Sequence, residues 1–150
     1  METIVEYRYR SPLHPLHAVC LAGAAALYLA AALSDAAYAR TYEIQWANFS
    51  AWLIAGGLVL GAVALLCGVL GLARAAGRGR RGLSYIVLLI VTWGLGFFNA
   101  LVHARDAWAM MPLGLVLSVI VTLLAMAACW VGMSAPRTIQ TRSTRAGGVA

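Results

Sequence analysis

The chain has 150 residues, of which 63% are hydrophobic and only 11% are charged. A soluble domain usually carries about 25% charged residues, so too few polar side chains remain here to cover a water-facing surface. This composition excludes an ordinary soluble protein and predicts one compact integral membrane protein. Eleven arginines against five acids give a formal net charge of +6. Because the arginines fall in short segments beside apolar runs, they indicate membrane topology and not binding to nucleic acid.

Residues 1–15 form a polar leader that ends in Ser11-Pro12-Leu13-His14-Pro15. The two prolines favour an extended or turned backbone followed by entry into a helix. The first apolar run, residues 16–38, is longer than the apolar part of a secretory signal peptide, which has about 7–15 residues. We therefore expect this run to remain in the protein as its first membrane span.

Three further apolar runs follow at residues 49–72, 83–101 and 111–133. Each has roughly the 20 residues that a helix needs to cross a bilayer, and none alternates as a barrel strand would. The sequence therefore predicts an all-α fold, a polytopic bundle of four transmembrane helices within residues 16–133. We expect residues 39–48 to form a loop and residues 134–150 to form a flexible basic tail.

The arginines divide unequally between the two ends of this bundle. Nine lie in the leader, in the segment 73–82 and in the tail, whereas the loops after the first and third spans hold only Arg40 and Arg105. The positive-inside rule then predicts a multi-pass membrane protein with both termini cytoplasmic (N-in and C-in). The outer interface would carry a belt of aromatic residues: Tyr38, Tyr42, Trp46, Phe49, Trp52 and Trp108.

Small residues recur along one face of the second span, at Gly57, Gly61, Ala64, Gly68 and Gly71. Lipid gives helices no hydrophobic reason to associate, so small residues must let two backbones approach each other closely. We expect the alanine-rich first span to pack on this face within one chain. The alternative is a homodimer formed through the same face.

Polar residues also recur at helical spacing, and we expect these stripes to face other helices because a polar group facing lipid is costly. The stripes include His17, Tyr28 and Asp35 in the first span, Thr92, Asn99 and His103 in the third, and Ser118, Thr122 and Cys129 in the fourth. The candidate binding residues are His14, His17, Asp35, Asn99, His103 and Arg105. Asp35 is expected to pair with Arg105 or His103 at the outer end of the bundle. The alternative there is a ligand, quinone or proton site that opens outward.

Haem ligation by two histidines is not expected. His17 begins the first span and His103 ends the third, so their depths differ by roughly 25 Å. A haem held by His17 and Met126 remains open, as does a metal site in which His17 joins the three cysteines, which share its depth. We expect neither, and no pairing of nucleophile with base, phosphate loop or paired catalytic carboxylates appears. The chain is therefore predicted to bind no cofactor or metal and not to be an enzyme.

The segment Ser11-Pro12-Leu13-His14-Pro15 resembles the His-Pro-Leu-His-Pro opening of a bacterial family of predicted membrane proteins, with serine in place of the first histidine. This family is catalogued as domain of unknown function twenty-two thirty-one. The resemblance covers about residues 11–133 and extends to Asp35, the Gly- and Ala-rich second span and the polar cluster with Asn99 and Arg105. It implies a multi-pass protein of the bacterial inner membrane and carries over no activity, although some relatives look like membrane modules fused to redox domains.

These observations favour a non-enzymatic structural or accessory protein of the membrane. A small electron-transfer or quinone-linked subunit is the first alternative, and an oligomeric transporter is the second. The expected partners are the lipid bilayer and either further copies of the chain or a larger membrane complex, without nucleic acid.

Overall fold

The computed structural model describes residues 5–10, 13–74, 80–134 and 138–143. Five helices follow one another along the chain: α1 (Pro15–Thr41), α2 (Ile44–Arg74), α3 (Arg80–His103), α4 (Ala107–Met110) and α5 (Leu113–Met133). All but the single-turn α4 are long and apolar enough to cross a membrane. The predicted bundle of four transmembrane helices is thus confirmed.

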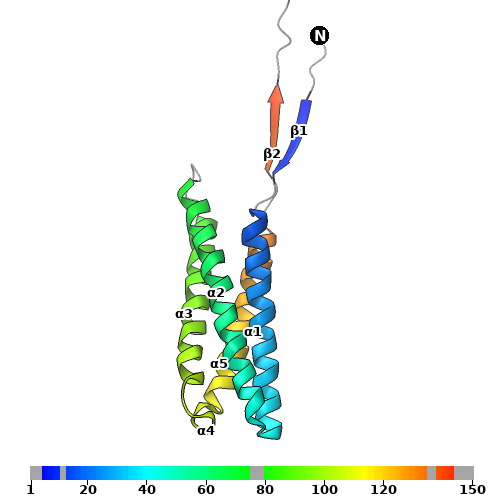
Figure 1. The fold of residues 1–150 in the computed structure, drawn as a ribbon. Coiled ribbons are helices and arrows are strands. Elements are labelled where there is room, and N and C mark those ends of the chain that lie inside the picture. Colours follow the sequence, from blue (N-terminus) through cyan, green and yellow to red (C-terminus); the bar gives the residue numbers. More distant parts are fainter. Residues whose placement is uncertain (1–4, 11–12, 75–79, 135–137, 144–150) are drawn as a thin grey trace, which may run out of the picture.

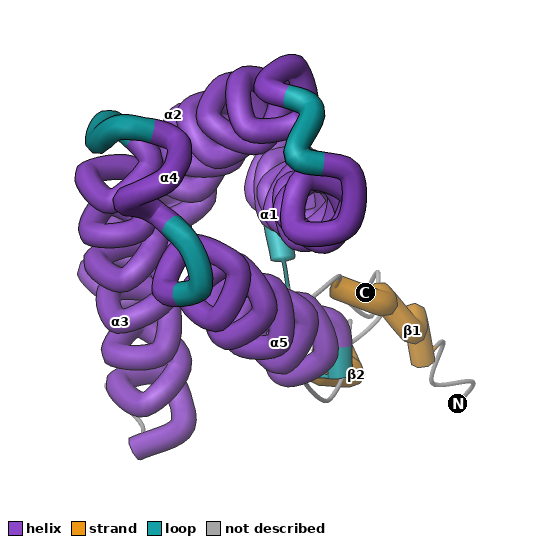
Figure 2. The backbone as a smooth tube through the Cα atoms, turned by 90° about the horizontal axis from the view of Figure 1, so that it is seen from below, coloured by secondary structure: helices purple, strands orange, loops and turns teal. Residues whose placement is uncertain are grey.

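The four spans run alternately in opposite directions (Figure 1). α1 packs against α2 and α5, and α3 packs against the same two helices, so the spans close a ring in the order α1, α2, α3, α5 (Figure 2). α1 and α3 therefore finish at the same end of the bundle. We call this the turn end, because it holds the α1–α2 turn at Tyr42 and Glu43 and the short helix α4.

The helices continue further than the sequence predicts at the turn end. The expected loop 39–48 is wrong, since Tyr42 and Glu43 alone separate α1 from α2. Tyr42 ends α1 in the left-handed conformation (φ 55°), and its N–H donates to the Tyr38 carbonyl over 2.8 Å. Residues 39–48 contain neither proline nor glycine to break a helix, so polar character alone did not stop helix growth.

Close packing between α1 and α2 depends on glycine, as predicted. A Cβ atom built on Gly57 would lie 2.8 Å from a ring carbon of Tyr28 in α1, whereas one on Gly68 would lie 3.0 Å from Ile86 of α3 and 3.3 Å from His17 of α1. The predicted face ends before Gly71, where an added Cβ would meet nothing within 4 Å. Intramolecular packing therefore accounts for this small-residue face from Gly57 to Gly68.

A two-stranded antiparallel ribbon continues from the opposite end of the bundle, which we call the ribbon end (Figure 1). It pairs β1 (Val5–Arg10) with β2 (Thr138–Ser143), in a register that sets Val5 opposite Ser143. Residues 138–143 of the expected tail thus form a strand. Both strands contain β-branched or aromatic residues, and the ring of helices brings their ends together.

The central arginine-rich segment is shorter than expected as a connection. α2 extends to Arg74 and α3 begins at Arg80, while residues 75–79 of the predicted segment lie outside the described residues.

At the turn end, the predicted aromatic residues do gather, since the rings of Tyr42 and Trp108 stack with centroids 5.6 Å apart. Trp52 and Trp108 are among the most exposed side chains of the bundle.

Candidate functional site

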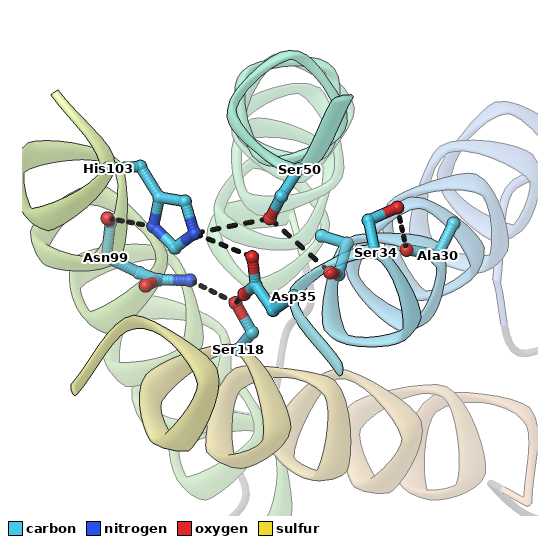
Figure 3. Close-up of polar contacts among 8 residues, drawn as sticks. Ala30, Ser34, Asp35, Ser50, Asn99, His103 and Ser118 are labelled. Carbon is cyan, nitrogen blue, oxygen red and sulfur yellow. Dashed lines mark hydrogen bonds and ion pairs between the residues drawn. The ribbon is translucent and has the colours of Figure 1, made fainter. Parts of the chain in front are cut away.

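Five polar side chains from all four spans meet inside the bundle near the turn end (Figure 3). We call them the buried network: Asp35 of α1, Ser50 of α2, Asn99 and His103 of α3, and Ser118 of α5. Asp35, Ser50 and Asn99 are completely buried, and the exposures of Ser118 and His103 are 2% and 9%. A polar cluster at this depth must find its hydrogen-bond partners within the protein.

Helix length brings these side chains to one depth. Asp35 lies six residues before the end of α1, or about 9 Å along the axis, and Ser50 lies six residues after the start of α2. His103 is the last residue of α3, so its imidazole reaches inward from the helix end. Gly114 leaves room for the ring, because a Cβ there would lie 3.0 Å from His103 Cε1.

The carboxylate of Asp35 is the centre of the network. Its Oδ1 lies 3.0 Å from His103 Nε2, and its Oδ2 accepts a hydrogen bond from the Ser118 hydroxyl over 2.5 Å. The Asn99 amide in turn donates to Ser118 Oγ over 2.9 Å. One acid thus links α1 directly to α3 and α5.

The imidazole of His103 has acceptors at both nitrogens. Its Nδ1 lies 3.0 Å from the main-chain carbonyl of Asn99, which can only accept, so Nδ1 carries a proton. Its Nε2 faces the Asp35 carboxylate and also lies 3.2 Å from Ser50 Oγ, which donates to the Ala31 carbonyl over 3.4 Å. The pair is neutral as a whole, whether the shared proton resides on the ring or on the acid. A neutral pair is far less costly to bury than a single charge.

The residue types resemble those of a hydrolase triad, but the arrangement differs. In such a triad the serine and the acid contact different nitrogens of the histidine. Here Ser50 and Asp35 both face Nε2, while Nδ1 is occupied by its own helix. Ser118 contacts the acid and not the ring. The network therefore lacks the geometry that would activate a serine nucleophile.

Comparison with protein families identifies the class of the chain. The sequence model of the family described as "Predicted membrane protein (DUF2231)" matches residues 13–144, which include all four spans and the whole buried network. The chain belongs to this family. The resemblance carried by its opening segment is thereby confirmed. No curated protein and no solved structure matches the chain.

This DUF2231 protein brings together three of the six predicted site residues. Asp35, Asn99 and His103 meet, whereas Arg105 is exposed on the loop after α3. The expectation left two partners for Asp35, and the structure pairs it with His103. The reason is depth: Arg105 lies beyond the end of α3, whereas the His103 ring extends back into the bundle.

The other two histidines of the DUF2231 protein lie at the ribbon end, far from the network. His14 caps α1, since its Nδ1 accepts from the Leu16 N–H over 3.3 Å. His17 Nε2 lies 2.9 Å from the Tyr85 hydroxyl, and the two rings stack. His17 thus joins α1 to α3, and the described residues contain no group of three or more His, Cys, Asp or Glu side chains that could hold a metal.

Two members of the network lay outside the predicted site. Ser118 belongs to the polar stripe of the fourth span, which the sequence predicts to face the other helices. Ser50 is a lone serine in an apolar run and belongs to no polar repeat. Tyr28 also lies on the predicted inward stripe and is 2% exposed. Its hydroxyl has no hydrogen-bond partner among the described residues, and neither does the Asn99 side-chain oxygen.

Proposed function

We propose that this DUF2231 protein is a non-enzymatic structural or accessory subunit of the bacterial inner membrane, with both termini in the cytoplasm. The observation that carries the proposal is that the Asp35 carboxylate is satisfied within the buried network. Asp35, the residue most costly to bury, takes its contacts from His103 and Ser118 of neighbouring spans. Such a network holds helices in register and leaves its acid no free oxygen to offer a substrate.

The geometry at His103 also supports a non-enzymatic role. Its Nδ1 is occupied by the main-chain carbonyl of Asn99, and its Nε2 is shared between Asp35 and Ser50. A general base needs a nitrogen within hydrogen-bond reach of the proton it removes from a substrate. With both nitrogens engaged and the residue 9% exposed, His103 is suited to joining helices.

The exposed surface supports an accessory role within a membrane. Large apolar side chains such as Val19, Trp130 and Leu123 are 65–77% exposed along the spans. They are matched to lipid or to the apolar helices of another membrane protein, and the strong arginine bias supports the proposed orientation.

The test separates a structural network from a chemical site. We would express the parent, Asp35→Asn, His103→Gln and the double variant in bacteria, solubilise the membranes in a mild detergent, and measure folded protein together with the complex that co-purifies. For a structural network, the amount of complex should follow the amount of folded protein in every variant. A variant that folds to the parental level but loses its associated complex, or loses a measurable turnover, would contradict the proposal.

A further inference from the structure

A groove of about 560 Å³ lies between α1 and α5 on the outer surface of the bundle. Alanines of α1 and larger apolar residues of both helices line it: Ala22, Ala25, Ala26, Leu29, Met126, Cys129, Trp130 and Met133, with Ser134 at one end. The Cys129 thiol donates to the Leu21 carbonyl over 3.6 Å, so it contributes little polarity to the groove. The groove is therefore apolar, with a single polar residue, Ser134, at one end.

The groove extends through about half of the membrane. From Met126 to Ser134 it follows eight residues of α5, or about 12 Å, and it ends where α5 ends at the ribbon. The hydrocarbon layer is about 30 Å thick, so this length corresponds to one leaflet. Trp130, 77% exposed, and Met126 and Met133, both 52% exposed, form a rim that opens toward lipid.

These dimensions distinguish between two occupants. A membrane-spanning helix of a second copy that packed along its whole length would need a complementary face about 30 Å long, and the groove offers less than half of that. A single acyl chain of the adjacent leaflet has the matching length and chemistry. Its headgroup would then lie beside Ser134, at the ribbon end of the bundle.

The ribbon end is strongly basic. β1 contains Arg8 and Arg10, and its one acid, Glu6, lies opposite Arg142 of β2 in the strand register, so the ribbon carries a net positive charge. At the turn end, Arg40 in the last turn of α1 is balanced by Glu43 of the α1–α2 turn, and Arg105 after α3 is balanced by Asp106. Basic segments beside a membrane span attract anionic lipids. The net positive charge of the ribbon is thus complementary to an anionic headgroup at this end of the bundle.

From this juxtaposition of an apolar groove and a basic ribbon, we infer that the α1–α5 groove binds one acyl chain of an anionic phospholipid. The phosphate of this lipid lies at the ribbon end of the bundle. The Trp130 indole then lies near the headgroup level, which is the depth that tryptophan prefers in membrane proteins. This lipid site is separate from the buried network, which lies toward the opposite end of the bundle.

The experiment uses nanodiscs with equal amounts of dioleoyl phosphatidylglycerol and dioleoyl phosphatidylethanolamine, followed by native mass spectrometry. The parent should release from the disc with phosphatidylglycerol attached. Filling the groove with Ala22→Phe and Ala26→Phe should abolish this retention, because both alanines are exposed in the groove. The matched control, Ala55→Phe with Ala62→Phe on an exposed face of α2, should retain the lipid.

The charge component is tested by replacing Arg8, Arg10 and Arg142 with glutamine. The preference for phosphatidylglycerol over phosphatidylethanolamine should then fall toward equality, whereas Arg105→Gln at the turn end should leave it unchanged. Equal retention in the groove-filled and control variants, or no headgroup preference in the parent, would overturn the inference. So would efficient disulfide cross-linking of Trp130→Cys between two copies, which would place a second chain in the groove.

A second measurement covers the outcome that the groove-filled variant does not fold. Brominated phosphatidylglycerol at low mole fraction should quench tryptophan fluorescence of the folded parent more strongly than brominated phosphatidylethanolamine. The difference should vanish in Trp130→Phe and persist in Trp52→Phe, which removes an exposed tryptophan near the turn end. A difference that survives in Trp130→Phe would refute the site.

Discussion

Asp35 and His103 lie 3.0 Å apart although 68 positions separate them in the sequence, and their side chains are 0% and 1% exposed. This contact joins the first and third spans, which lie across the ring from each other with α2 and α5 between them (Figure 2). The pair links α1 to α3 near the turn end, as the contact of His17 with Tyr85 does at the ribbon end.

The first prediction concerns this pair. Asp35→Asn and His103→Gln should each lower the free energy of unfolding by about 1–3 kcal/mol, between the values for an interhelical hydrogen bond in a membrane and for a broken buried ion pair. The double variant should recover part of the loss, because neither partner is then left alone. A double-mutant cycle on unfolding in detergent measures this coupling.

Arg105→Gln is the control for that cycle. The side chain is exposed, so its replacement should change stability by less than about 0.5 kcal/mol. Strict additivity between positions 35 and 103, or a loss in Arg105→Gln as large as that in His103→Gln, would show that the pair does not form.

The second prediction concerns the glycine face of α2. Gly57→Leu should destabilise the bundle by about 1–3 kcal/mol, because a Cβ there would lie 2.8 Å from the Tyr28 ring. Gly71→Leu on the same helix is the matched control, since nothing lies within 4 Å of its added Cβ. Thermal unfolding of both variants in one detergent is the measurement, and equal transition temperatures would mean that α2 does not pack on α1 as described.

The third prediction concerns the hydroxyl of Tyr28. It is buried between Gly57 and Gly96 without a hydrogen-bond partner among the described residues. An unpaired buried polar group is destabilising, so Tyr28→Phe should leave the free energy of unfolding unchanged or raise it by about 1 kcal/mol. Tyr28→Ala should lower it by about 3 kcal/mol or more, because the ring itself fills the core. A large loss in Tyr28→Phe would reveal a partner for the hydroxyl.

The fourth prediction concerns orientation. In a variant with the three native cysteines replaced by alanine, a cysteine at Gln45 should react in intact cells with a membrane-impermeant maleimide, because this exposed residue lies at the turn end. A cysteine at Gln140, in β2 of the ribbon, should react only with a permeant reagent. The arginine excess at the ribbon end is the physical reason. The reverse labelling pattern would place the termini outside.

The number and approximate limits of the spans, and the inward stripes that contain Asp35, Asn99 and His103, followed from the sequence alone. These properties depend on each segment by itself, since bilayer thickness sets the length of an apolar run and helical spacing sets which residues share a face. Turn positions were less predictable: residues 39–48 are polar enough for a loop, yet helical hydrogen bonding continues through most of them.

The partner of Asp35 was decided by the tertiary structure. Both His103 and Arg105 follow Asn99 within two turns, and a helix rotates by about 100° per residue, so small differences in rotation and axial offset select one or the other. Those two quantities are set jointly by all four helices, through contacts such as Tyr28 against Gly57 and His103 against Gly114. The same dependence explains why Ser50 was not predicted as part of the network: it belongs to no polar repeat in its own helix, and only the packing of the helices brings it to His103. It also explains the ribbon, because the ring of spans brings the two distant strands together.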